Sequence, residues 1–269
     1  MLFLLSPAKS LDYQTPVPKA LARRTTAPLY MDQAALLIQQ LARLSPPQVA
    51  QLMDLSDELA ALNVGRYAAW QPHHSPDGTP DNSRPAVLAF NGDVYDGLDA
   101  RSLSPAQLDW AQDHVVILSG LYGALRPFDA LQPYRLEMGT ALANPRGKNL
   151  YAFWGDTVAQ YLNSRQADEA APVVVNLASQ EYFKVADRPA LAARVVECVF
   201  EDWKASASGG QYKIISFFAK RARGAMARWA IQHKPRSVKA LQAFDADGYG
   251  YTPALSSPDR LVFRRRVAG

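Results

Sequence analysis

Five short apolar segments of this chain each end directly in polar side chains that could bind a ligand. Their sequences are LFLLSPAK (2–9), AVLAFNGDVY (86–95), VVILSGLYG (115–123), VVVNLASQEYFK (173–184) and KIISFFAKRAR (213–223). Such runs are typical of strands buried on both faces, and parallel strands of an open sheet present their carboxyl ends at one ligand-binding edge. The pattern predicts one cleft, lined by Ser6, Asn91, Asp93, Ser119, Tyr122, Arg135, Asn176, Ser179 and Glu181.

Each of these segment ends, taken singly, also has a purely structural explanation. Serine and asparagine often cap the helices that follow strands, and Gly120 and Gly123 can supply turn conformations. Arg126, Pro127 and Asp129 can form a turn that is braced by a local ion pair. Five polar ends together favour a cleft, because unrelated corners need not all carry hydrogen-bonding side chains.

Recognised catalytic and metal-binding motifs give little support for an enzyme. Ser6-Pro7-Ala8-Lys9 matches S-x-x-K, in which lysine activates a serine nucleophile, but the companion S-D-N and K-T-G elements are absent. The sequence contains no G-x-S-x-G, P-loop, G-x-G-x-x-G or H-E-x-x-H motif, and its four histidines are scattered. Cys198 is the single cysteine, so a cysteine-cluster metal site is excluded. His73 and His74 are neighbours in the sequence, but no third metal ligand is evident beside them. We therefore predict no metal site and no cofactor.

The basic residues are concentrated late in the chain, although the net charge is only +4, from 29 basic and 25 acidic residues. On a helix that begins near Phe217, Lys220 and Arg223 share one face and Arg221 and Arg228 share a neighbouring one. Gly224 between them permits close approach by another backbone or by a phosphate. A basic helix face is often merely solvated, but this one follows a predicted strand end. The predicted DNA- or phosphate-binding residues are Lys9, Arg126, Lys184, Lys213, Lys220, Arg221, Arg223 and Arg228.

Helices must position these strand ends. A helical block over residues 32–70 is interrupted at Ser45-Pro46 and at Ser56, each a typical helix start. The last two helices resemble a helix-hairpin-helix in outline without its Gly-x-Gly turn, so an ordinary helical hairpin is the alternative. Ser104-Pro105 starts another helix, and a further one covers 156–165. With no internal repeat or domain boundary, we predict one α+β domain over 1–269, with a mixed central sheet flanked by helices.

Nothing in the sequence predicts export or membrane insertion. The N-terminal MLFLL has no preceding basic residue and no cleavage pattern, so it is interpreted as a first strand. No window approaches the run of about 20 apolar residues that a membrane span requires. The expectation is a cytoplasmic protein without a membrane partner.

Long ordered segments of the chain resemble the YaaA family of bacterial peroxide-stress resistance proteins, from Met1 to about Arg265. They include LLSPAKSLDY, FNGDVYDGL, LSGLYGALRPFDALQPYRLEMG, GKNLYAFWGD, VVNLASQEYFK and KIISFFAKRARGAMARW. The resemblance implies a cytoplasmic protein that limits damage to DNA and protein by lowering unincorporated iron. It also implies double-stranded DNA binding through a basic cleft and a helix-hairpin-helix element, on a single-domain fold of unusual topology. No established reaction comes with it.

Two hypotheses follow for the function. The first is a peroxide-stress protein that binds double-stranded DNA without sequence preference, because Lys and Arg on a helix neutralise phosphates and no base-reading module is recognisable. Direct iron binding fits the residues less well, because they show no clustered carboxylates and imidazoles. The alternative is an enzyme that acts on a phosphorylated or nucleotide-like small molecule at the cleft.

Overall fold

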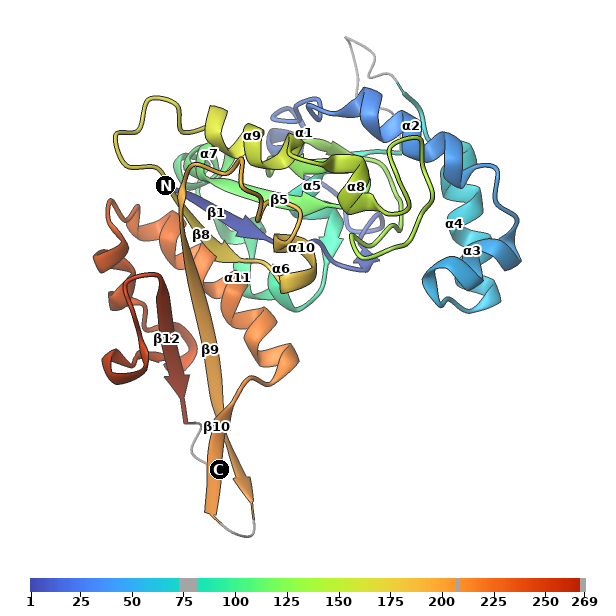
Figure 1. The fold of residues 1–269 in the computed structure, drawn as a ribbon. Helices are drawn as coiled ribbons and strands as arrows, with labels where there is room; N and C mark the ends of the chain where they lie inside the picture. The colour runs from blue at the N-terminus through green and yellow to red at the C-terminus, as the bar shows by residue number, and fades with distance from the viewer. Residues whose placement is uncertain (73–81, 207–208, 267–269) are drawn as a thin grey trace.

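A mixed sheet forms the centre of the computed structural model, which describes residues 1–72, 82–206 and 209–266 (Figure 1). In spatial order its strands are β11 (Gly250–Tyr251), β12 (Arg260–Arg265), β9 (Arg194–Ser206), β8 (Val173–Leu177), β1 (Leu2–Leu5), β5 (Val115–Ser119) and β6 (Gly123–Leu125), with β10 (Gly209–Lys213) also paired to β9. β12, β9, β8, β1 and β5 are parallel, whereas β6, β10 and β11 run antiparallel to their neighbours. The predicted fold class, a mixed central sheet flanked by helices in a single domain, is confirmed.

The three strands at the middle of the sheet were predicted correctly. All side chains of β1 and β5 are buried, as are four of the five in β8. In the parallel register Leu5 lies beside Ile117 of β5 and Leu177 of β8. Continuous burial explains why these segments are apolar throughout, and the register explains why their polar ends meet at one edge.

Two of the five predicted strands are wrong. Residues 86–89 form the short helix α5 (Ala86–Ala89), and β4 (Phe90–Asn91) pairs with β2 (Ser10–Leu11) outside the central sheet. Another small pair joins β3 (Arg84–Pro85) to β7 (Ala130–Leu131). In the last segment, β10 ends at Lys213 and Ile214 is 57% exposed. A short apolar run cannot by itself distinguish a buried strand from a buried helical turn.

The predicted helix starts are confirmed. The side-chain oxygens of Gln48 and Gln107 accept from the backbone N–H groups of Ser45 and Ser104, each at 2.8 Å, so both serines begin capping boxes. The α-helices are α1 (Lys19–Ala22), α2 (Met31–Leu41), α3 (Pro46–Met53), α4 (Asp57–Ala69), α6 (Asp93–Leu98), α7 (Pro105–His114), α8 (Leu150–Trp154), α9 (Thr157–Ser164), α10 (Gln180–Phe183) and α11 (Ser216–His233). The 3₁₀ turns are η1 (Ala100–Ser102), η2 (Val238–Ala243), η3 (Ala246–Gly248) and η4 (Pro253–Leu255).

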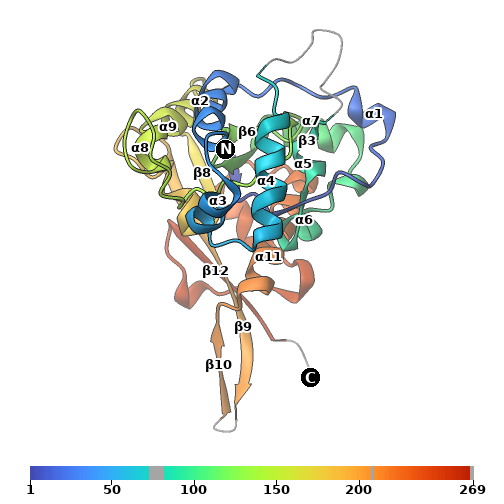
Figure 2. The same cartoon turned by 90° about the vertical axis from the view of Figure 1, so that its right-hand side faces the viewer.

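α3 and α4 form a helical hairpin, with Asp54 in the left-handed conformation at the turn (φ 52°). Ser56 caps α4, and the helix continues to Ala69, close to the end of the predicted helical block. The helical hairpin that the sequence predicted is thus present, and any role for it in DNA binding stays a prediction. The pair lies at the right-hand side of Figure 1 and faces the viewer in Figure 2.

α11 lies along the sheet and in contact with α6, and this crossing positions the basic residues. α11 contacts β9, β8 and β1 of the sheet as well as α6 and α7. Gly224 of α11 meets the backbone of α6 at Val94 and Leu98, and Gly97 of α6 meets the backbone of α11. The sequence predicted that Gly224 allows close approach by another backbone or by a phosphate. In the structure it is the backbone of α6 that approaches Gly224.

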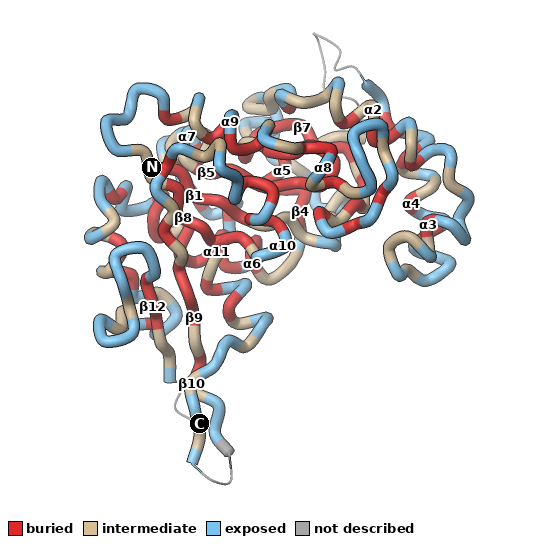
Figure 3. The backbone as a smooth tube through the Cα atoms, in the orientation of Figure 1, coloured by how far each residue is buried: buried red, intermediate tan, exposed pale blue. Residues whose placement is uncertain are grey.

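β9 and β10 extend beyond the rest of the molecule as a two-stranded ribbon (Figures 1 and 2). Figure 3 shows that the sheet centre is buried, whereas much of this ribbon is exposed. Among the described residues, no helix has the length and apolar character to cross a membrane.

Candidate anion-binding pocket

A pocket of about 460 Å³ lies where β1 and β8 end. Ser6 to Ser10 follow β1, Asn91 to Val94 lead from β4 into α6, and Ser179 to Tyr182 include the start of α10. The predicted site residues that line this pocket are Ser6, Lys9, Asn91, Asp93, Arg135, Ser179, Glu181, Lys220 and Arg223. The structure thus brings these nine, from segments far apart in the sequence, to one place at the sheet edge.

The two serines at the strand ends connect β1 to β8. The backbone N–H of Ser179 donates to the Ser6 hydroxyl oxygen at 2.9 Å, and the Tyr95 hydroxyl donates to the Ser6 carbonyl at 3.1 Å. Lys9 Nζ lies 2.8 Å from a carboxylate oxygen of Glu137. Ser6 is therefore bonded to the neighbouring strand end, and Lys9 to an acid, instead of to each other as a serine–lysine dyad.

The acidic residues of the pocket are partly neutralised. Glu137 accepts from Lys9 and also from Arg135, whose Nη2 lies 3.0 Å from Oε1. Glu181 accepts from the backbone N–H of Gly139 at 2.9 Å. The lining contains the acids Asp93, Glu137 and Glu181 and the cations Lys9, Arg135, Lys220 and Arg223, so it keeps one net positive charge.

Two cations of α11 face this pocket without a close acidic partner. Among the described residues, neither Lys220 nor Arg223 forms an ion pair, and Arg223 Nε is buried without a hydrogen-bond partner. Burial lowers the pKa of the Arg223 guanidinium, and the nearby charge of Glu197 opposes that shift. At neutral pH this side chain is a partly desolvated cation beside an open pocket.

Arg221 and Arg228, on the neighbouring face of α11, are engaged in structural contacts. Arg221 Nε lies 3.3 Å from Oδ2 of Asp247. Arg228 Nη1 donates to the backbone carbonyls of Asp99 and Leu98, at 2.8 and 3.1 Å. Neither of these two arginines lines the pocket. The predicted basic helix therefore carries Arg221 and Arg228, which are held by protein contacts, and Arg223, which faces the pocket.

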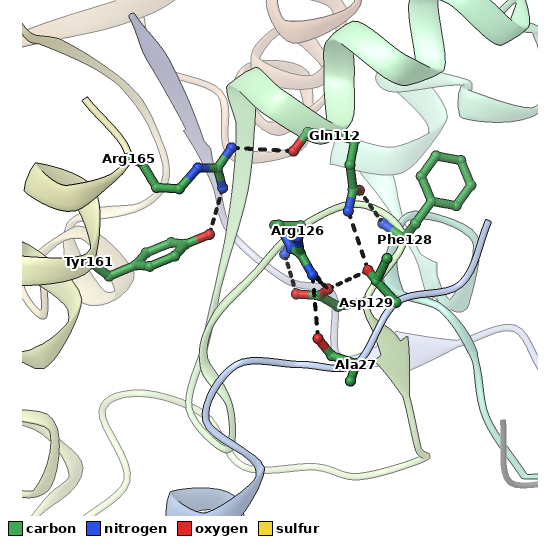
Figure 4. A network of polar contacts seen from close by, with 8 residues as sticks. Ala27, Gln112, Arg126, Phe128, Asp129, Tyr161 and Arg165 are labelled. Atoms are coloured by element: carbon green, nitrogen blue, oxygen red, sulfur yellow. Dashed lines mark hydrogen bonds and ion pairs between the residues drawn. The ribbon is translucent and has the colours of Figure 1, made fainter. Parts of the chain in front are cut away.

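Arg126, which was predicted to bind DNA or a phosphate, does not line the pocket, and the alternative of a braced turn is confirmed. Its guanidinium forms hydrogen bonds to Oδ1 of Asp129 at 2.9 and 3.1 Å, and Figure 4 shows this pair together with the Ala27 carbonyl. Asp129 is 1% exposed, and the Thr26 hydroxyl donates to it at 2.7 Å. This network lies away from the residues that line the pocket.

Three predicted cleft residues, Ser119, Tyr122 and Asn176, are buried and do not line the pocket. The Ser119 hydroxyl lies 2.7 Å from the hydroxyl of Tyr134, which does line the pocket. The Tyr122 hydroxyl accepts from the indole of Trp70 at 3.0 Å. Asn176 accepts from the backbone N–H of Ala178 at 2.9 Å. A polar residue at a strand end can satisfy backbone groups as readily as it can meet a ligand.

Lys184 and Lys213 also lie outside the pocket. Lys184 Nζ sits 4.9 Å from the centre of the Tyr151 ring, and Lys213 is exposed at the end of β10. Their predicted contact with DNA stays a prediction.

Of the pocket wall at residues 134–137, only Arg135 was predicted from the sequence. Tyr134, Leu136 and Glu137 line the pocket from a stretch after β7 that has no regular secondary structure. Tyr182 lines it too, and burial raises the pKa of the Tyr134 and Tyr182 hydroxyls, which therefore stay neutral donors. The alternation of Tyr134, Arg135, Leu136 and Glu137 was the available signal, but no periodic element accompanied it.

Over residues 1–72, 82–206 and 209–266, no three His, Cys, Asp or Glu side chains stand close enough to hold a metal ion. His73 and His74 lie outside the described residues. Cys198 is buried, and burial raises the pKa of its thiol to about 12.

Comparison with known proteins identifies the family. A family model described as peroxide stress protein YaaA matches residues 1–255. A UPF0246 protein of Leptothrix cholodnii is 68% identical over 268 residues, which is 100% of both chains. A UPF0246 protein of Bordetella avium is 62% identical over 267 residues, covering 99% of this chain and 100% of the relative. The resemblance found in the sequence is thereby confirmed, and the chain belongs to the peroxide stress protein YaaA family.

Proposed function

We propose that this chain acts in the peroxide stress response by lowering unincorporated iron and by binding double-stranded DNA without sequence preference. Membership of a peroxide stress family supports the first part. The DNA part is supported by the position of exposed cations at the start of α11 and on the adjoining ribbon. Phosphate contacts by such side chains give affinity without reading the bases.

The observation that carries the DNA proposal is the pair Lys213 and Lys220. Lys213 ends β10, Lys220 lies one residue beyond the first turn of α11, and both are exposed. Neither forms an ion pair within the described residues, in contrast to Arg221. Lys204, which lies opposite Gln211 on the facing strand of the ribbon, is also exposed and adds a third cation. Such side chains can reach DNA phosphates without first breaking a protein contact.

The double substitution Lys213→Ala with Lys220→Ala should weaken duplex binding and flatten its salt dependence. If each lysine neutralises one phosphate, the slope of log K against log salt should become less negative by roughly 1.8, at about 0.9 per phosphate. Fluorescence anisotropy with a labelled duplex at several salt concentrations measures both quantities. Since both side chains are exposed, the melting temperature should hardly change.

The matched control is Lys19→Ala with Lys148→Ala, which removes the same charge from exposed positions away from the pocket. This control should keep nearly the wild-type slope. Equal losses of duplex affinity in the two double variants would mean that only net charge matters, and would remove Lys213 and Lys220 from the interface. A wild-type chain without salt-sensitive duplex binding would end the DNA proposal.

The iron part of the proposal needs a test in cells. A strain that lacks this protein should contain more chelatable iron after hydrogen peroxide, as measured by electron paramagnetic resonance of chelator-treated cells. Complementation with the wild type should reverse the rise. If the lysine double variant also reverses it, DNA binding and iron lowering are separable. An unchanged iron signal in the deletion strain would refute the iron part.

A further inference from the structure

We infer that the pocket at the ends of β1 and β8 binds a small phosphate monoester that also carries hydroxyl or amino groups, with Arg223 and Lys220 holding the phosphate. This inference concerns an enclosed site and a small ligand, so it goes beyond the proposed DNA binding. The ribbon lysines Lys204 and Lys213 do not line the pocket, so they take no part in this ligand site.

Arg223 is the strongest evidence for an anion. Within the described part of the chain its Nε is buried without a hydrogen-bond partner, although the side chain lines the pocket. The nearby acid Glu197 forms no ion pair with it, and instead accepts from Gln180 at 3.2 Å and lies 3.9 Å from Arg260. A partly buried guanidinium without a counter-charge is unfavourable, and an anionic ligand in the pocket would supply that charge. Lys220, on the same helix face, adds a second cation for the same anion.

The size and position of the pocket favour a small ligand. Its volume of about 460 Å³ lies within the usual range of small-molecule sites, and the carboxyl edge of parallel strands is where open sheets bind such ligands. A duplex phosphate is flanked by sugars on both sides and belongs to a rigid rod. It can meet the exposed Lys220 at the rim, whereas a small ester can enter the pocket and also meet the Arg223 side chain.

The rest of the lining indicates what the phosphate is attached to. Tyr134, Tyr182 and Leu136 give the pocket an aromatic and apolar wall that suits a sugar or a base. Asp93, Glu137 and Glu181 provide carboxylate acceptors in the same lining. A ligand with an anionic end and hydrogen-bond donors elsewhere, such as a sugar phosphate or a nucleoside monophosphate, matches both sets of groups.

Isothermal titration of the full chain with AMP, ribose 5-phosphate, inorganic phosphate and adenosine tests this inference. We expect saturable binding of at least one of the two phosphate esters, weaker binding of inorganic phosphate, and none of adenosine, which lacks the anion. If none of the phosphate compounds shows saturable binding at about 5 mM, the inference is overturned. Adenosine binding as tight as AMP binding would also overturn it.

Two substitutions test the residues with whichever ester binds. Arg223→Met and Lys220→Ala should each weaken binding by roughly tenfold or more, because each removes a charge-assisted hydrogen bond. Arg221→Ala is the matched control, since Arg221 lies on the same helix but pairs with Asp247. It should leave the affinity unchanged. Should Arg223→Met fail to fold, the exposed Lys220→Ala still decides, and unchanged affinity in that variant contradicts the inference.

A cross-comparison separates this site from the proposed DNA surface. Lys213→Ala should weaken duplex binding and leave ester binding intact, whereas Arg223→Met should do the reverse. If Arg223→Met abolishes duplex binding as well, and duplex displaces the bound ester from the wild type, the pocket takes a DNA phosphate and the small-molecule inference fails. Loss of duplex binding in Lys213→Ala alone would leave it standing.

Discussion

Replacing Asp202 by alanine should lower the free energy of unfolding by about 3–5 kcal/mol, because it leaves a buried arginine without its counter-charge. Asp202 is 2% exposed, and its Oδ1 lies 2.7 Å from Nε of Arg265. Its other oxygen accepts from the Tyr249 hydroxyl, also at 2.7 Å. Removing Asp202 therefore strands both a charge and a hydroxyl in the interior. Equilibrium unfolding in urea measures the loss.

The same substitution at a surface ion pair provides the control. Asp259 pairs with Arg194, and their side chains are 65% and 45% exposed. Asp259→Ala should change the free energy of unfolding by about 1 kcal/mol or less, since water solvates the remaining arginine. Equal losses in the two variants would show that Asp202 contributes only as an ordinary surface charge. The Asp202–Arg265 pair matters for the proposed DNA surface because it joins β9 to β12 at the base of the ribbon.

Asp202 also explains why the longest strand was not predicted. Along β9 the buried side chains Val196, Cys198 and Phe200 alternate with the more exposed Glu197 and Glu201. That alternation is the ordinary signal of a strand. It continues inward to Asp202, where a carboxylate takes the place of an apolar residue. Because the partner arginine is 63 residues further along the chain, the local pattern gave no reason to bury an acid.

The sheet centre was predictable for the opposite reason. β1 and β5 carry apolar side chains on both faces, and no distant partner is needed to explain their burial. The run at residues 86–89 has the same composition but forms the helical turn α5, whose first N–H groups donate to the carbonyls of Asp129 and Pro127. Partners that lie about 40 residues away decided that conformation.

The predicted site could be located but not resolved into roles. Strand ends at one edge pointed to the pocket, because the direction of parallel strands fixes where their ends lie. Which arginines of α11 are available to a ligand depends instead on acids and carbonyls elsewhere. Asp247 holds Arg221, and the backbone at Asp99 holds Arg228, whereas the structure places no comparable partner at Arg223. Helical periodicity separated these two faces of α11 without showing which one was occupied.

Gly224→Ala should destabilise the protein by about 3 kcal/mol or more, near or beyond the upper end of the usual effect of overpacking. A Cβ at this position would lie 1.8 Å from the carbonyl oxygen of Val94, which is backbone and cannot rotate away. Gly97 on the facing helix has the same relation to the carbonyl of Arg221, at 2.1 Å. The two glycines thus allow α6 and α11 to touch through their backbones, and either new methyl group would force them apart.

Gly65→Ala is the matched control, because Gly65 also lies within a helix but a Cβ there would meet nothing within 4 Å. That variant should gain about 0.5–1 kcal/mol from helix propensity. Urea unfolding of both variants decides the matter, and a Gly224→Ala protein as stable as the wild type would contradict the close crossing.

Asp93 and Val94 of α6 line the pocket beside Lys220 and Arg223 of α11. Separating the helices should therefore weaken phosphate-ester binding as well, whereas Gly65→Ala, on distant α4, should leave it unchanged.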